Sequence, residues 1–322
     1  MEVLGKMNAG RLLSKRNFAS VAVYFGFVVL FLIFAITLRD VGAGFVSLSN
    51  LMNILRQTSL IAVMAVGLTF VLGSAQIDLS VGSVVGVASL IAALAAREYG
   101  ILAGVIAGIA VGGAVGAFNG LLTSQLKVPA FLATLGSMII FAGVSRSLTN
   151  LKSIPITDET YKFIFGGGSI GFFPILGIWM IVIVGLGYTA MKKTGFGRRV
   201  IAVGSNPVAA RYSGVRTKRV MFSVMMLSGL LAGLAGVLWA GRFGGGRYSL
   251  GEGAELSVIA ATVLGGTSIY GGKATVLGAA IGAIMIGMIN NALILYGLDV
   301  YQQMIVRGII IVVAVAITTS RE

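Results

Sequence analysis

The feature that most constrains this chain is a succession of apolar runs, each long enough to cross the ~30 Å hydrocarbon core of a bilayer as a helix. About ten such runs follow one another, near residues 20–38, 52–73, 80–97, 100–122, 130–149, 174–191, 219–240, 255–267, 275–296 and 302–319. Polar residues interrupt the second run and shorten the eighth. Only 11% of the residues are charged, far fewer than in soluble domains. The sequence therefore predicts an all-α polytopic membrane protein with about ten transmembrane helices.

The basic residues assign an orientation to these runs. With the N-terminus inside and the runs alternating, most of the 24 lysines and arginines fall on the inner side and most of the ten acidic residues fall outside. Both termini are therefore predicted to be cytoplasmic, with a cytoplasmic tail over residues 1–19. The net charge of +14 then reflects membrane topology rather than a surface for nucleic acid.

Two connecting segments are much longer than the others. Residues 150–173 form the outer loop, which is long enough for a small cap on the outer face. Residues 192–219 form the largest inner loop and carry the densest cluster of basic residues. We expect a single transmembrane domain over residues 1–322, with these two loops on opposite sides of the membrane.

The inner loop contains the signals of a short capped helix. Asn206 can cap a helix start, Pro207 suits the first helical position, and Gly214 is placed to end the helix. On the sequence alone, this helix is either a surface that a partner protein grips or an amphipathic connector that rests on anionic lipid headgroups.

A weak internal repeat relates two parts of the chain. VLGSAQI at 71–77 and VLGGTSI at 263–269 each lie at the inner end of an apolar run. Each also precedes a Gly-x-x-x-Gly helix, with the pairs Gly82/Gly86 and Gly278/Gly282. A duplicated bundle is typical of transporters, although the alignment of the two segments needs a gap.

Four stretches together resemble the permease subunits of ribose-type ABC sugar importers, within the branched-chain amino acid, ribose and xylose type of binding-protein-dependent permeases. They are NILRQTS at 53–59, AVGLTFVLGSAQIDLSVGS at 65–83, TGFGRRVIAVGSNPVAARYSGV at 194–215 and GEGAELSVIAATVLGGTSIYGGKATVLGAAIGA at 251–283. The matches follow the family's order along nearly the whole chain. This sequence departs from the family at 74–76, where Ser-Ala-Gln replaces a double glycine, and at Ser205, where glycine is commoner.

The resemblance implies a transport subunit with no catalytic site and no cofactor of its own, in the bacterial cytoplasmic (inner) membrane. A second permease copy, or a related permease, would complete the pathway. Two ATP-binding cassette subunits, which use ATP and Mg, would bind inside, and a periplasmic or lipid-anchored sugar-binding protein would dock outside. By the same analogy the ATPase-coupling helix comprises Asn206, Pro207, Ala209, Ala210, Arg211, Tyr212, Ser213, Gly214 and Val215.

Asp78 is the acidic residue that the apolar pattern explains least. It follows the second run at its inner end and precedes the next apolar helix. A carboxylate there can accept hydrogen bonds from the free amides of the helix, and its charge suits the positive helix start. Alternatively, Asp78 belongs to a gate or pathway lining that hydrogen-bonds sugar hydroxyls, because an ionisable residue within a membrane is commonly functional.

Other polar residues in or beside the apolar runs are further candidates. Asparagine amides in such helices either bond neighbouring helices or offer donors and acceptors to an uncharged sugar. The candidates for a pathway or gate are Gln76, Asp78, Ser80, Asn119, Asn290 and Asn291. Four charged residues at the outer edge either pair with one another or form docking charges for a binding protein: Glu252, Glu255, Arg242 and Arg247.

The sequence favours a translocation subunit for a neutral monosaccharide, a ribose-like pentose or a hexose, powered by ATP hydrolysis on another chain. The glycine-rich stretch at 264–273 lacks the Gly-Lys-Ser/Thr ending of a P-loop, so we expect a tight inner turn there. An ion-coupled secondary sugar transporter is the alternative, although Asp78 is the only acid expected near the inner membrane boundary. An intramembrane enzyme would have few candidate catalysts, because the chain contains no cysteine and no histidine.

Overall fold

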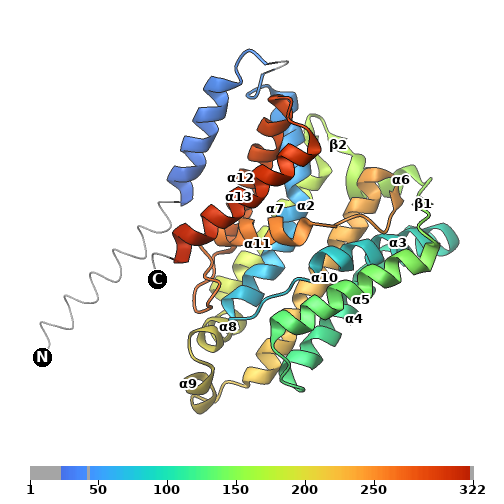
Figure 1. The fold of residues 1–322 in the computed structure, drawn as a ribbon. Coiled ribbons are helices and arrows are strands. Elements are labelled where there is room, and N and C mark those ends of the chain that lie inside the picture. The colour runs from blue at the N-terminus through green and yellow to red at the C-terminus, as the bar shows by residue number, and fades with distance from the viewer. Residues whose placement is uncertain (1–22, 42–43, 320–322) are drawn as a thin grey trace, which may run out of the picture.

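The computed structural model describes residues 23–41 and 44–319, so the predicted tail over residues 1–19 lies outside the described residues. Within these residues the chain is mainly helical (Figure 1). Seven of the described helices are long and apolar enough to cross a membrane. They are α2 (Leu48–Gly73), α3 (Val81–Tyr99), α4 (Ile101–Ser124), α5 (Ala130–Thr149), α7 (Ile175–Lys193), α10 (Thr217–Phe243) and α12 (Val276–Leu295). The prediction of a mainly α-helical, multi-pass membrane protein is therefore confirmed.

The three remaining predicted runs also contain helices. Val23–Thr37 is a shorter apolar helix, α11 (Ala254–Leu264) has 11 residues, and α13 (Val300–Thr319) has 20. The second run, in which an interruption was predicted, is instead one continuous helix of 26 residues. Its polar residues are accommodated because Thr58 and Ser59 donate to the carbonyl of Leu55, at 3.2 and 2.6 Å.

The centre of the bundle is a glycine contact between α4 and α10. A Cβ atom on Gly229 of α10 would lie 2.7 Å from the Cα of Gly116, and one on Gly112 of α4 would lie 2.6 Å from the Cα of Gly233. Real Cβ atoms do not approach backbone so closely. Each helix presents its glycines four residues apart, the spacing that lets membrane helices pack backbone to backbone.

The two long connections fold at opposite ends of the bundle (Figure 1). At one end lie α8 (Gly195–Ser205) and α9 (Pro207–Tyr212). At the other end, a small cap contains β1 (Ile154–Pro155), α6 (Glu159–Lys162), η1 (Phe163–Gly167), β2 (Ser169–Ile170) and β3 (Phe173–Pro174).

Short strands and one buried side chain attach this cap to the bundle. β1 pairs antiparallel with β4 (Gly245–Gly246), so that Ile154 lies opposite Gly246, and β2 pairs antiparallel with β3. The side chain of Tyr161 is fully buried, and its hydroxyl donates to the carbonyl of Val237 on α10 at 3.3 Å. Burial raises the pKa of the Tyr161 phenol, so the hydroxyl keeps the proton that it donates.

The first and last described helices run in opposite directions. Val23 and Tyr24 line a small cavity with Lys192, at the end of α7 that leads to α8. At the other end of the first helix, Thr37 accepts a hydrogen bond of 2.6 Å from the hydroxyl of Tyr296, just before α13 begins. The described ends of the chain, at residues 23 and 319, thus point toward the side that carries α8 (Figure 1).

The central glycine contact predicts that the same substitution has different effects in two helices. Gly229→Ala should lower the thermal stability of the detergent-solubilised protein, because the added methyl group meets the backbone of α4 and such overpacking typically costs about 1–3 kcal/mol. Gly136→Ala in α5 should be neutral or slightly stabilising, because no atom lies within 4 Å of the new methyl group. Equal melting temperatures for the two variants would contradict the proposed packing.

Candidate functional site

Asp78 lies in the linker 74–80 between α2 and α3, and its side chain is only 1% exposed. One carboxylate oxygen, Oδ1, accepts hydrogen bonds from the backbone N–H of Ser80 at 2.9 Å and from the Ser80 hydroxyl at 2.6 Å. The other oxygen, Oδ2, accepts a bond of 2.7 Å from the hydroxyl of Ser228 on α10. Both oxygens of the buried carboxylate are therefore satisfied by neutral donors.

The same hydrogen bonds continue into two further helices. Asn119 of α4 donates from Nδ2 to the Ser80 hydroxyl at 2.9 Å, and Ser137 of α5 donates its hydroxyl to the Asn119 carbonyl oxygen. We call these five residues the Asp78 network: Asp78, Ser80, Asn119, Ser137 and Ser228. All five side chains are exposed by 2% or less. The network ties the linker to α4, α5 and α10, and each of its side-chain bonds is donated toward the carboxylate.

The prediction that the Asp78 side chain caps the following helix is wrong. Helix α3 begins at Val81, with Ser80 at the N-cap and no side-chain capping bond. The carboxylate instead accepts the amide of Ser80, two residues along the chain, which is the local bond that aspartate makes in turns. Asp78 therefore fixes the shape of the linker, while Ser83 satisfies the carbonyl of Ser80 with a hydroxyl bond of 2.8 Å.

Three backbones meet at the end of α8, and we call Gly73, Gly204 and Gly272 the glycine junction. The N–H of Gly272 donates to the carbonyl of Gly73 at 3.1 Å. A Cβ atom on Gly204 would strike the Gly73 carbonyl and would lie 2.7 Å from the Gly272 nitrogen. Because Gly73 ends α2 and Gly272 lies between α11 and α12, α8 contacts the first segment of the predicted internal repeat and the turn that follows the second.

The short capped helix predicted after Asn206 is present as α9. Asn206 accepts the amides of Val208 and Ala209 in its side-chain oxygen, at 3.0 and 2.9 Å, and Pro207 opens the helix. The chain leaves the helix through Ser213 and Gly214, where φ is +82°. The predicted cap and the predicted glycine exit are both confirmed.

The surface of α9 is largely apolar and open. Val208 and Tyr212 are 62% and 89% exposed, and their spacing of four residues places them on one face. Ala210 is buried against the bundle, whereas Ala209, Arg211 and Ser213 are exposed and Val215 is half-buried. The preceding helix α8 was not predicted, although Thr194 caps it by accepting the amides of Phe196 and Gly197.

One of the two interpretations of the outer charged residues, that they pair with one another, is wrong. Glu252 pairs with Arg146 at 2.5 Å. In the part of the chain that the structure describes, neither Arg242 nor Arg247 pairs with a carboxylate; Arg242 lies over the ring of Phe243 instead. The pair between Glu252 and Arg146 was missed because the two residues are far apart in the sequence and meet only in the folded bundle.

Glu255 does not lie at the outer edge as predicted. A Cβ atom on Gly82, in the first turn of α3, would strike the Glu255 carboxylate and would lie 2.5 Å from the carbonyl of Gly251. The segment 244–253 therefore enters the bundle beside α3 before α11 begins. The sequence signal that could have revealed this path is Gly251-Glu252-Gly253, because both glycines adopt positive φ, +87° and +75°.

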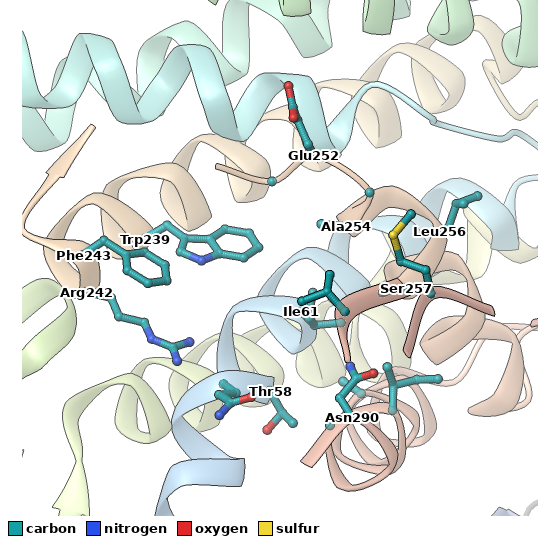
Figure 2. Close-up of a pocket in the computed structure, with 18 of the residues that line it drawn as sticks. Thr58, Ile61, Trp239, Arg242, Phe243, Glu252, Ala254, Leu256, Ser257 and Asn290 are labelled. Carbon is teal, nitrogen blue, oxygen red and sulfur yellow. The ribbon is translucent and has the colours of Figure 1, made fainter. Parts of the chain in front are cut away.

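A cavity of about 550 Å³ lies at this point of entry (Figure 2). Trp239, Arg242 and Phe243 of α10 line one side, and Leu256 and Ser257 of α11 line the other. Figure 2 shows Thr58 and Ile61 of α2 and Asn290 of α12 below them. Residues of α13, including Val300 and Met304, complete the lining.

The remaining pathway candidates divide between two environments. Asn291 forms a reciprocal amide pair with Asn50 of α2, at 2.8 and 3.0 Å, and so joins two helices as Asn119 does. Asn290 lines the 550 Å³ cavity, and its carbonyl oxygen has no partner among the described residues. Gln76 is half-buried and lines a second cavity, of about 290 Å³, together with Pro207 and Arg211.

Over residues 23–41 and 44–319 no group of three or more acidic, histidine or cysteine side chains could hold a metal ion. The stretch 264–273 forms a turn with positive φ at Gly266, Gly271 and Gly272, as predicted for a tight connection.

Comparisons with known proteins agree on one family. Residues 50–315 match the family model described as branched-chain amino acid transport system / permease component. The chain is 39% identical over 288 residues to the Probable ABC transporter permease protein YphD of Escherichia coli (strain K12), covering 89% of this chain and 85% of that protein. No solved structure matches the chain.

Two further relatives have names that state a sugar. The chain is 37% identical over 285 residues to the ribose import permease protein RbsC of Escherichia coli (strain K12), covering 87% of this chain and 88% of RbsC. It is 34% identical over 301 residues to the L-arabinose ABC transporter permease protein AraH of Azospirillum brasilense, covering 92% of this chain and 88% of AraH.

The Asp78 network predicts a specific loss of stability for Asp78→Asn. The new amide group would place a donor where the carboxylate accepts, which leaves at least one buried hydroxyl or amide unsatisfied at a cost of about 1–3 kcal/mol. Thermal unfolding in detergent should show a lower melting temperature. Glu98→Gln is the matched control, because Glu98 is 56% exposed and forms a surface ion pair with Arg97; an equal shift in both variants would refute the structural role of Asp78.

Proposed function

Because the chain belongs to the family of branched-chain amino acid transport system permease components, and within it to the ribose-type ABC permeases, we propose that it is the translocation subunit of a sugar importer. The cargo is a neutral monosaccharide, a ribose-like pentose or a hexose, delivered by an extracytoplasmic binding protein. The energy comes from ATP hydrolysis on a separate subunit, and this chain contributes no catalytic site and no cofactor; ATP and Mg belong to that partner.

The observation that carries this proposal is the exposed face of α9. A short capped helix that presents Val208 and Tyr212 at the end of the bundle has the form of a docking element for a partner protein. Aromatic side chains are enriched among the residues that anchor protein interfaces. Two ATP-binding subunits would bind α9 of two permease copies, either a homodimer or a pair with a related permease.

The proposed membrane topology follows the orientation that the basic residues predict. Ten membrane passes, counting the first helix, α11 and α13, would place both termini and the segment 192–219 in the cytoplasm. The cap formed by residues 150–173 would then face the binding protein, with Arg242, Arg247 and Glu252 as candidate docking charges near it. The membrane would be the cytoplasmic (inner) membrane of a bacterium.

A route for coupling between α9 and the interior is supported by the glycine junction. Helix α8 is joined to α9 through Asn206 and touches Gly73 and Gly272 near its end. Gly73 leads directly into the linker that Asp78 anchors, and Gly272 belongs to the turn after α11. A displacement of α9 by the ATPase would reach both linkers through backbone contacts, with no intervening flexible side chain.

The first test is co-purification of the tagged permease with the ATP-binding subunit in detergent. Val208→Asp combined with Tyr212→Ala should abolish recovery of the ATPase, because it removes the exposed apolar face without touching the buried Ala210. Tyr301→Ala is the control, since Tyr301 is 78% exposed at the other end of the bundle. Uptake driven by an ion gradient in liposomes that contain this chain alone would instead establish the secondary transporter.

A second prediction separates docking from coupling. Gly204→Ala should keep the ATPase bound but reduce ATP-dependent sugar uptake at least tenfold, because the added methyl group forces α8 away from Gly73 and Gly272. Gly185→Ala in α7 should transport normally, since its added methyl group meets no atom within 4 Å. Normal uptake by Gly204→Ala would exclude the glycine junction as the coupling route.

A further inference from the structure

We propose that the 550 Å³ cavity beside α11 is the site at which the permease itself holds a monosaccharide during passage, with Trp239 as the stacking surface. This inference rests on the proposed function and adds to it a binding site and the residues that form it. The volume falls in the range of roughly 300–1,000 Å³ that small-molecule sites occupy.

The position of the cavity favours a binding site. It lies over the start of α11, a helix of only 11 residues that begins inside the bundle after the segment 244–253 has entered beside α3. Interrupted helices of this kind form substrate sites in other transporters, because irregular backbone within a membrane is tolerated where it lines a cavity. Here the cavity is lined by Gly251, Gly253 and Ala254 at that start.

The two tryptophans of the chain differ in how they are held. Trp179 donates its indole N–H to the carbonyl of Ile164 at 2.9 Å and stacks on Phe165. Trp239 faces the cavity beside Phe243 (Figure 2) and makes no such bond within the described residues. Its indole therefore offers an apolar face for the C–H face of a sugar ring and a free N–H donor for a hydroxyl.

Polar groups around Trp239 suit hydroxyl groups of a ligand. Asn290 lines the cavity, and its carbonyl oxygen is buried without a partner in the described part of the chain. A small rotation of this side chain would present the unsatisfied acceptor to a hydroxyl donor. Arg242, also on the lining, supplies guanidinium donors, and Gln57 and Ser257 add further donors and acceptors.

The same lining disfavours an amino acid. A zwitterion needs a carboxylate to receive its ammonium group, and Glu252, the carboxylate on the lining, is held by Arg146 at 2.5 Å. Few charges and several neutral hydrogen-bonding groups beside an aromatic face fit an uncharged polyol better. The cavity therefore assigns a sugar as the ligand class.

Single-tryptophan variants test this site directly, because the chain contains 2 tryptophans. Trp179→Phe leaves Trp239 as the reporter, and Trp239→Phe leaves Trp179. The full-length permease in lipid nanodiscs is titrated with D-ribose, L-arabinose or L-leucine while tryptophan emission is recorded. A saturable change with at least one of the two sugars is expected in Trp179→Phe, and no change is expected in Trp239→Phe.

Adding Asn290→Leu to Trp179→Phe should weaken the sugar response about fivefold, the loss expected for one hydrogen bond of ~1 kcal/mol. This second variant leaves the reporter in place. Its melting temperature identifies a folding defect, and an unchanged sugar affinity in the folded double variant would remove Asn290 from the site.

Three results would overturn the inference: no saturable response to either sugar, an equal response in both single-tryptophan variants, or a response to L-leucine alone. Uptake of labelled D-ribose and L-arabinose by the wild-type permease with its partners is measured in parallel. Uptake without a Trp239 response counts against the cavity alone, whereas absence of uptake of both sugars counts against the pentose cargo of the proposed function.

Discussion

The structure depends on satisfying backbone polar groups in linkers that enter the bundle, where water is scarce. Three such linkers interrupt the helices, at 74–80, 244–253 and 265–275. Their polar groups bond to neighbouring helices or within the same linker: Gly272 donates to Gly73 at the end of α2 at 3.1 Å, and the Thr275 hydroxyl donates to Gly265 at 2.5 Å. The carboxylate of Asp78 has the same task, because it converts an irregular linker into a fixed point shared by α4, α5 and α10.

Close backbone approach is the second consequence of this constraint. Where helices or linkers touch backbone to backbone, a side chain would separate the groups that must bond, and glycine is then required. Gly229 against Gly116 is a contact of this kind between two spans. Gly204 against Gly73 and Gly272 is another, between α8, the end of α2 and the linker 265–275. Gly136 and Gly185 meet nothing within 4 Å, so a high glycine content does not by itself identify the structural glycines.

Local signals in the sequence predicted the elements well, and tertiary partners explain what was missed. The apolar runs identified the helices, and the cap at Asn206 and the exit at Gly214 identified α9, because these features depend only on neighbours in the chain. The partner of Glu252 is Arg146, and the partners of Asp78 include Ser228, 150 residues away. Such pairs have no local pattern. The path of 244–253 into the bundle was missed for the same reason, since its extended backbone is satisfied by β1 and by Ser89.

Helix α11 connects the proposed sugar-binding cavity to the glycine junction. Its first residue, Ala254, lines the cavity, and its last, Leu264, leads into the turn that carries Gly272. Within the glycine junction, Gly272 is thus connected to α11, which forms part of the cavity wall. Gly73 is connected to the linker 74–80, which Asp78 anchors. Glu255 and Gly251 pack on Gly82 at the start of α3, so the same two segments meet again inside the bundle. A movement of α8 that shifted Gly272 but not Gly73 would displace α11 relative to α3, and the contact at Gly82 is where that displacement would change the shape of the cavity.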